Sequence, residues 1–149
     1  SINYRLVSDY GTIPDEFSQA VEALPGLSAR QKDQGKAFYP AGRDSKAALS
    51  WLFANATTYG IDTNSVSIVG SSAGAYIAMA LGVTEPEDYR EELSIELDPT
   101  VNTTNLDQTI EVHSIIDLWG SGSMVDIHNG IYGHDRWDNT DAPVAIVHG

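Results

Sequence analysis

Three things are scarce in this chain of 149 residues: cysteine, basic side chains and long apolar runs. Cysteine is absent altogether, which excludes disulfide bonds and thiol chemistry. Lysine and arginine number 8 against 21 aspartates and glutamates, for a net charge of −13. Nucleic acids and anionic membrane surfaces are therefore not the expected partners. No apolar run reaches the length needed to span a membrane.

The rest of the composition is that of a globular domain. Hydrophobic residues make up 42% of the chain and aromatic residues 9%, and a chain of this length can bury a core. No repeat, low-complexity tract or linker divides it, so we expect one domain over residues 1–149. The acidic surface suits a secreted, periplasmic or salt-tolerant protein without deciding among them, and the oligomeric state is left open.

Hydrophobic periodicity divides the chain into alternating strands and helices. Strands are predicted over residues 1–7, 66–71, 110–119 and 142–149, and helices over residues 14–24, 44–60, 72–82 and 84–93. Residues 28–42 and 98–109 are polar and aperiodic, which indicates loops, and residues 123–141 have no clear period. Such alternation predicts a mostly parallel sheet with helices on both faces.

The most informative stretch is residues 66–80. Residues with a strand-like, β-branched bias lead into Gly70-Ser71-Ser72-Ala73-Gly74, and a helical run of small residues follows. Strand, tight turn and helix are the context that the Gly-x-Ser-x-Gly pattern requires, because the turn raises the serine above the carboxyl edge of the sheet. The two glycines are expected to avoid Cβ collisions where strand and helix cross. The alternative without a catalytic role is an ordinary strand-to-helix turn that uses small residues.

This stretch, together with residues 44–62, resembles the α/β-hydrolases of the carboxylesterase and lipase type. In that family a helix ending in Gly-x-Asp, here Gly60-Ile61-Asp62, leads into the strand before the serine. The resemblance implies a partial α/β-hydrolase fold, a three-layer sandwich. It also implies that Ser72 is the nucleophile, that the Ala73 N–H belongs to the oxyanion hole, and that Gly70 and Gly74 shape the nucleophile elbow.

Both ends of the chain resemble further strands of the same family. Residues 1–7 contain Asn-Tyr-Arg-Leu, as the family's fourth strand often does, and residues 142–149 end in His-Gly, like the strand that precedes the triad acid. The family order is serine, acid, histidine, so the resemblance implies that the acid and the histidine lie beyond residue 149. It also implies a His-Gly-Gly-type loop before Ser1. The chain would then be an internal piece of a larger catalytic domain, inactive by itself.

A triad completed within these residues would use Asp117, near the end of a predicted strand, with His128 or His134. We favour a different interpretation, in which Asp117 bonds the loop at the strand end and both histidines lie on a polar surface loop. His148 is expected to be a structural residue of its strand end.

No metal or other cofactor is expected. His113, His128, His134 and Asp135 lack the spacing of a zinc site, and the acidic residues 135–141 lack the glycine of an EF-hand loop.

The sequence therefore predicts a serine hydrolase that cleaves small-molecule carboxylic esters through a Ser-His-Asp/Glu triad and an acyl-enzyme. Two alternatives stay open. The same fold could serve a serine peptidase of the prolyl-oligopeptidase type or an acyltransferase. It could also serve a catalytically inactive, hydrolase-like binding module.

Overall fold

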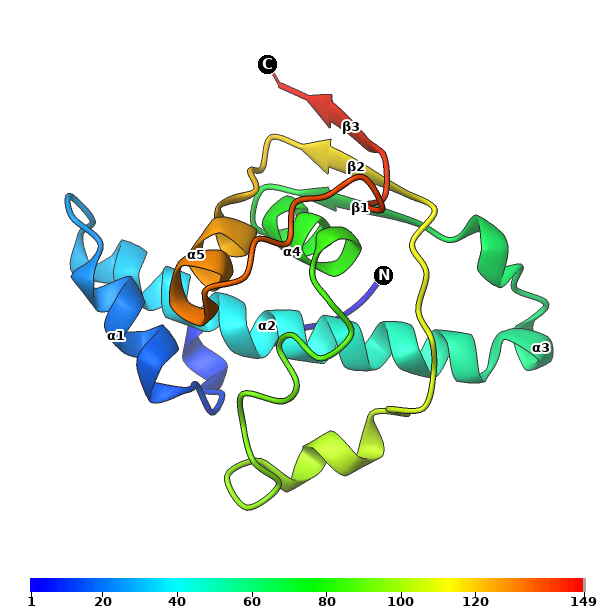
Figure 1. Cartoon of the computed structure of the whole chain (residues 1–149), viewed down its shortest axis with the longest axis horizontal. Helices are drawn as coiled ribbons and strands as arrows, with labels where there is room; N and C mark the ends of the chain where they lie inside the picture. The colour runs from blue at the N-terminus through cyan, green and yellow to red at the C-terminus, as the bar shows by residue number, and fades with distance from the viewer. Residues whose placement is uncertain (149) are drawn as a thin grey trace.

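Three parallel strands form the sheet in the computed structural model, which describes residues 1–148 (Figure 1). They are β1 (Ser67–Ser71), β2 (Ser114–Leu118) and β3 (Val144–Val147), in the order β1-β2-β3. The register places Val69 opposite Ile116 and Ile116 opposite Ala145. Each strand is joined to the next by a stretch that contains a helix, so the predicted alternation and the parallel sheet are confirmed.

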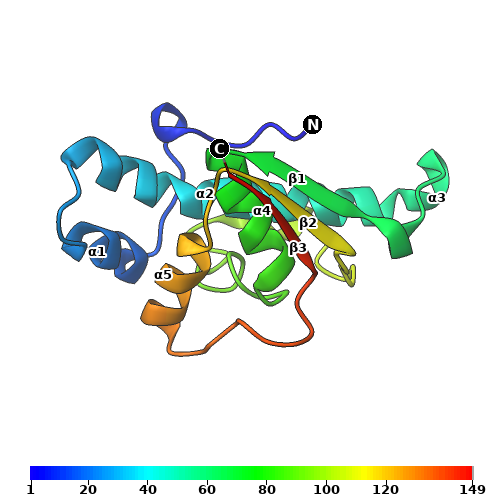
Figure 2. The same ribbon diagram turned by 90° about the horizontal axis from the view of Figure 1, so that it is seen from above.

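The helices stack beneath this sheet. Helix α4 (Ala73–Val83) packs directly on β1 and β2, and α2 (Ala29–Ala54) packs on α4 (Figures 1 and 2). Helices α1 (Asp15–Ala23) and α5 (Ser123–Tyr132) pack against each other, α1 also against α2 and α5 also against α4. The remaining elements are short: α3 (Ala56–Tyr59) and the 3₁₀ turns η1 (Val7–Asp9), η2 (Thr63–Ser65) and η3 (Pro99–Thr103).

Within residues 1–148, helices cover one face of the sheet. Side chains alternate along a strand, so Ile68 and Ile115 point toward α4, where Ile115 is fully buried. Val69 and Ile116 lie on the other face, and Val69 is 63% exposed. The apolar residues on both faces of β2 predicted helices on both sides. The second helical layer is not found in the described part of the chain.

The first half of α2 occupies residues predicted as a loop, whereas its second half confirms the helix predicted from residue 44. Ser28 and Gln31 form a capping box, in which each side chain bonds the other's backbone N–H. The helix continues through Pro40, which is buried, although proline usually interrupts a helix. Burial of the neighbouring Tyr39 against the core favours the continuous helix. Asp44, the first residue of the helix predicted over residues 44–60, therefore lies inside α2.

Asp44 also explains why residues 1–7 are not a strand. Its carboxylate accepts hydrogen bonds from the backbone N–H of Arg5 (2.8 Å) and from the Arg5 guanidinium (2.7 Å). Leu6 and Asp9 then close a 3₁₀ turn. A side chain thus takes the Arg5 donor that a strand would offer to its neighbour.

Residues 84–93, predicted as a helix, form successive turns. The carboxylates of Asp88 and Glu92 accept hydrogen bonds from the N–H groups of Glu85 (2.8 Å) and Tyr89 (3.0 Å). Tyr89 has a φ of 61°, which a helix does not tolerate, yet its ring is fully buried in the core. No helix in residues 1–148 has both the length and the apolar character that crossing a bilayer requires.

Candidate active site

Ser72 is the single residue between β1 and α4. Its φ of 51° and ψ of −123° lie in a region that residues other than glycine rarely adopt, and its side chain is exposed. The conformation is held from both sides, because the Ser72 N–H donates to the Leu118 carbonyl at the end of β2 (3.0 Å) and the Ser72 carbonyl accepts from Ala75 (2.9 Å). The prediction of a sharp turn between strand and helix at Ser72 is therefore confirmed.

The two glycines of the turn have different surroundings. A Cβ added to Gly70 would lie 2.0 Å from the carbonyl oxygen of Gly74, so only glycine allows β1 and α4 to approach this closely. A Cβ added to Gly74 would meet nothing nearer than the Tyr4 hydroxyl, at 3.9 Å. The prediction that a Cβ at Gly74 would collide with the strand is therefore wrong, because that Cβ would point away from β1.

The start of α4 provides a favourable place for negative charge. The first amides of a helix have no acceptor within it, and the helix dipole adds partial positive charge there. Ala73 is the first residue of α4, and the Ser72 side chain makes no capping hydrogen bond. An exposed hydroxyl and outward-facing amides thus lie together at the carboxyl edge of the sheet.

Trp119 is a neighbour of this turn that the sequence did not single out. It follows Leu118, whose carbonyl binds the Ser72 N–H, and its own N–H donates to the Val147 carbonyl (3.0 Å). Its φ is 50° and its side chain is 57% exposed. Positive φ is unusual for a bulky residue, and the sequence gives no sign of it, so the structure was needed to identify Trp119.

The structure does not bring Asp117 to a histidine. Asp117 is buried on the α4 side of β2, and its carboxylate accepts a hydrogen bond from the Gly120 N–H (2.5 Å). The prediction that Asp117 bonds the strand-end loop is confirmed. His134 is exposed after α5, as predicted, and His148 Nε2 lies 3.4 Å from the Gly120 carbonyl oxygen.

His128 was predicted on a surface loop, and that prediction is wrong. It is fully buried on α5, with Nε2 3.2 Å from Asp88 Oδ1 and 2.8 Å from Glu92 Oε1. Arg136 donates to both oxygens of Asp88. The missed signal was the amphipathic period of residues 123–132, which puts His128 on the buried side of α5 with Met124 and Val125.

These four side chains form a buried charge network. Ligand atoms of Asp88, Glu92 and His128 lie within 4.8 Å of one another, a spacing that a metal ion accepts. The carboxylates that would bind a metal ion already accept other hydrogen bonds, however. The Arg136 guanidinium donates to Asp88, and the Tyr39 hydroxyl donates to Glu92 (2.9 Å). The two carboxylates are already bonded to Arg136, Tyr39 and His128, so these residues fit a polar network better than a divalent cation.

The network should make stability depend on pH. Burial lowers the pKa of His128, but the hydrogen bonds to Asp88 and Glu92 outweigh it and hold the pKa above 6.5. Burial raises the pKa values of Asp88 and Glu92, and the bonds from His128 outweigh that effect. The imidazolium thus stabilises the fold below about pH 6.5 and is lost as pH rises through its folded pKa. The carboxylates stabilise above about pH 4 and are lost as pH falls.

We therefore expect the free energy of unfolding to be greatest between about pH 4.5 and 6.5. His128→Gln should lower it by about 3 kcal/mol at pH 6, because two buried carboxylates lose a cation, and should abolish the fall above pH 6.5. His134→Gln, at an exposed histidine, is the control and should leave the profile unchanged. Urea denaturation between pH 4 and 9 measures both variants. A decline above pH 6.5 that survives in His128→Gln would contradict this assignment.

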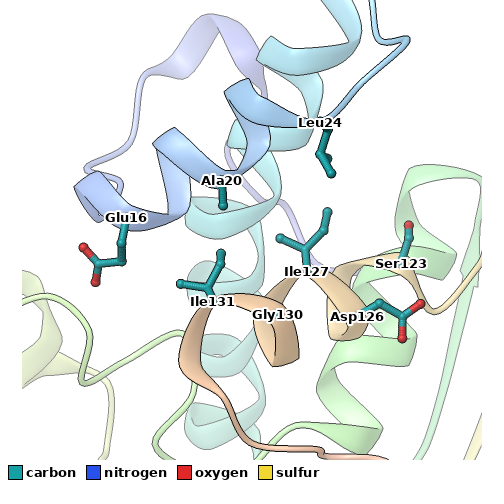
Figure 3. Close-up of a pocket in the computed structure, with 8 residues that line it drawn as sticks. All are labelled: Glu16, Ala20, Leu24, Ser123, Asp126, Ile127, Gly130 and Ile131. Atoms are coloured by element: carbon teal, nitrogen blue, oxygen red, sulfur yellow. The ribbon is translucent and has the colours of Figure 1, made fainter.

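A groove of about 610 Å³ lies between α1 and α5 (Figure 3). Ala20, Leu24, Ile127 and Ile131 give it an apolar lining, with the carboxylates of Glu16 and Asp126 beside them. None of its lining residues belongs to the β1–α4 turn. The groove is therefore separate from the residues that surround Ser72.

Comparison with known proteins gives two matches. A protein-family model described as BD-FAE matches residues 27–149. Esterase LipC of Mycobacterium tuberculosis (strain ATCC 25618 / H37Rv) is 28% identical over 101 residues, which cover 67% of this chain and 19% of that protein. The chain thus matches about a fifth of the length of this relative. No solved structure matches the chain.

Proposed function

The chain belongs to the BD-FAE family, of the α/β-hydrolase carboxylesterase type, and from this premise we propose that it is part of an ester hydrolase with Ser72 as nucleophile. The resemblance seen in the sequence is thereby confirmed at the level of the family. The observation that carries the proposal is the backbone of Ser72, strained between a parallel strand and a helix with its side chain exposed.

In the proposed reaction Ser72 Oγ attacks the ester carbonyl carbon while a histidine takes the hydroxyl proton. The carbonyl oxygen becomes an oxyanion, which the Ala73 N–H and the dipole of α4 stabilise. Collapse of this intermediate expels the alcohol, which receives the proton, and leaves an acyl group on Ser72. Water, deprotonated by the same histidine, then releases the carboxylic acid and restores the serine.

We place the histidine and its carboxylate partner outside residues 1–148. Asp117 is committed to the Gly120 N–H, and His128 is committed to Asp88 and Glu92. Neither is available to Ser72 without breaking a buried hydrogen bond, which is unfavourable. Residues 1–149 would then be part of one catalytic domain.

The experiment that tests the proposal is covalent labelling of the complete protein. A fluorophosphonate reagent should modify one serine per chain, and peptide mass spectrometry should place the adduct on Ser72. The Ser72→Ala variant should incorporate none. A label on another serine would assign the nucleophile elsewhere. Absence of labelling would instead favour a catalytically inactive binding module.

Trp119 is proposed to contact the substrate beside Ser72. Trp119→Ala should raise KM for p-nitrophenyl acetate about tenfold, with kcat changed less than about threefold, because an exposed aromatic contact contributes to binding rather than to the chemical step. Trp51→Ala removes an exposed tryptophan near the end of α2 and should leave both constants unchanged. An equal effect of the two substitutions, or an effect of Trp119→Ala on kcat alone, would contradict the contact.

A further inference from the structure

A cavity of about 60 Å³ lies at the other end of α4 from Ser72. It is bordered by α2, by the end of α4 and by the turns that follow α4, and its lining residues are Lys46, Leu49, Ser50, Leu81, Thr84, Pro86, Arg90 and Ile110. Ser72 precedes the first residue of α4, whereas Leu81 and Thr84 lie at the end of the helix, about 13 Å or more away at 1.5 Å per residue. The cavity is therefore separate from the proposed catalytic site.

Two cations without a carboxylate partner share this cavity. Of the 8 lysines and arginines, five form salt bridges with carboxylates: Arg5, Lys32, Lys36, Arg43 and Arg136. No such bridge is formed within residues 1–148 by Arg30, Lys46 and Arg90, and the latter two line the same cavity. This is unexpected in a chain with 21 acidic residues, which offers many carboxylates to pair with.

Both cations retain donors for a ligand. Lys46 is 5% exposed, and its ammonium donates to the Glu85 carbonyl, which uses one of its three N–H groups. The Arg90 Nη1 donates to the Pro86 carbonyl (3.0 Å), but the buried Arg90 Nε has no hydrogen-bond partner in the described structure. A buried donor without an acceptor is costly, so an acceptor in the cavity would be stabilising.

The surroundings of Lys46 also favour an anion. Burial lowers the pKa of Lys46 to about 8, and the carboxylates of Asp88, Glu92 and Glu87 oppose that shift only in part. A negative charge in direct contact would supply the remaining stabilisation of the ammonium. The neighbouring Arg90 adds to the lowering of the Lys46 pKa, and the aromatic ring of Tyr89 lies 6.0 Å from the ammonium nitrogen.

The other walls decide the class of anion. Leu49, Leu81, Pro86 and Ile110 are apolar, and the Thr84 hydroxyl is already engaged with the Ala80 carbonyl. Ser50 adds one hydroxyl to the lining. Phosphate or sulfate needs donors on all sides, which these walls do not offer. A short carboxylate such as acetate has one charged end and one apolar end. The cavity likewise has cationic residues and apolar residues in its lining. The volume is about twice the ~30 Å³ share of one water molecule, which suits an ion of the size of acetate.

We propose that this cavity binds a short-chain carboxylate, with its oxygens on Lys46 and the Nε of Arg90 and its methyl end among the apolar side chains. The site does not depend on ester hydrolysis by Ser72. It is a second ligand site, separated from the first by the length of α4.

The test is a calorimetric titration of the complete protein with sodium acetate at constant ionic strength. The protein carries the Ser72→Ala substitution, so that no ester hydrolysis contributes heat. One saturable site with a Kd at or below about 1 mM is expected. Arg90→Gln should weaken acetate binding at least about tenfold, because a charge-assisted hydrogen bond is lost. Arg30→Gln removes the same charge from an exposed position and should bind acetate unchanged. Formate should bind, whereas butyrate should not, because the cavity is too small for it.

Three results would overturn the proposal: no saturable heat with acetate, equal affinity in the Ser72→Ala protein with and without Arg90→Gln, or phosphate binding as tightly as acetate. If Arg90→Gln unfolds, which its circular dichroism would show, Lys46→Met gives the second variant, and the same loss of affinity is expected. Acetate binding that persists in Ser72→Ala separates this site from the proposed catalytic function, which labelling of Ser72 tests on its own.

Discussion

Replacing Ser72 by alanine in the complete protein should lower kcat/KM for p-nitrophenyl acetate by a factor of about ten thousand or more. The hydroxyl is the attacking group in the proposed reaction, so its loss removes the acyl-enzyme route altogether. What remains should be the weak catalysis of oxyanion donors and binding alone. The measurement is initial-rate kinetics on purified protein, with unfolding curves to show that the variant is folded.

Ser71→Ala is the matched control, because Ser71 is the adjacent exposed serine at the end of β1. It should retain activity within about threefold of wild type. If both variants lose activity equally, the effect belongs to the turn and not to the Ser72 hydroxyl. The 149-residue chain by itself should show no steady turnover. Steady turnover by this chain that Ser72→Ala abolishes would mean that the triad is complete within it.

Gly70→Ala should destabilise the fold by about 3 kcal/mol or more. The new Cβ would lie 2.0 Å from the backbone carbonyl oxygen of Gly74 and 2.6 Å from the backbone nitrogen of Ala75, and backbone cannot yield as a side chain can. Strand β1 and helix α4 would have to separate, which would open the core beneath Ile68. Urea denaturation with far-UV circular dichroism measures the loss.

Gly74→Ala makes the same chemical change four residues later and should be harmless. Its Cβ would meet only the Tyr4 hydroxyl at 3.9 Å, and alanine is favoured over glycine inside a helix by about 1 kcal/mol. The variant should therefore be as stable as wild type or slightly more so. Equal destabilisation by the two substitutions would refute the geometry of the turn.

The turn was predictable because its causes are local. Strand propensity, two glycines and a helical run lie within fifteen residues, and no distant contact is needed to recognise them. Helix α2 was harder to predict from the sequence. Its Ser28–Gln31 capping box is a local signal, but the continuation through Pro40 depends on the burial of Tyr39, which only the packed core provides. The polarity of residues 28–42 and their lack of a period indicated a loop, and tertiary packing overrides that local signal.

The buried network could not have been found from spacing. Asp88 lies 40 residues before His128 and 48 residues before Arg136, and turns rather than a helix bring its carboxylate inward. The same carboxylates accept hydrogen bonds from backbone N–H groups, and the left-handed conformation of Tyr89 interrupts the helix predicted over residues 84–93. Charge pairs of this kind depend on the whole fold, so residue order does not reveal them.

The hydrogen bond from Ser72 to Leu118 has a mechanical consequence. The Ser72 N–H binds the carbonyl of the Leu118–Trp119 peptide at the end of β2, and the N–H of that same peptide binds the Val147 carbonyl at the end of β3. The backbone of Ser72 is therefore held by hydrogen bonds that link the ends of all three strands. Changes in the length of the segment after Leu118 should move this peptide and, through its hydrogen bond, the backbone of the serine.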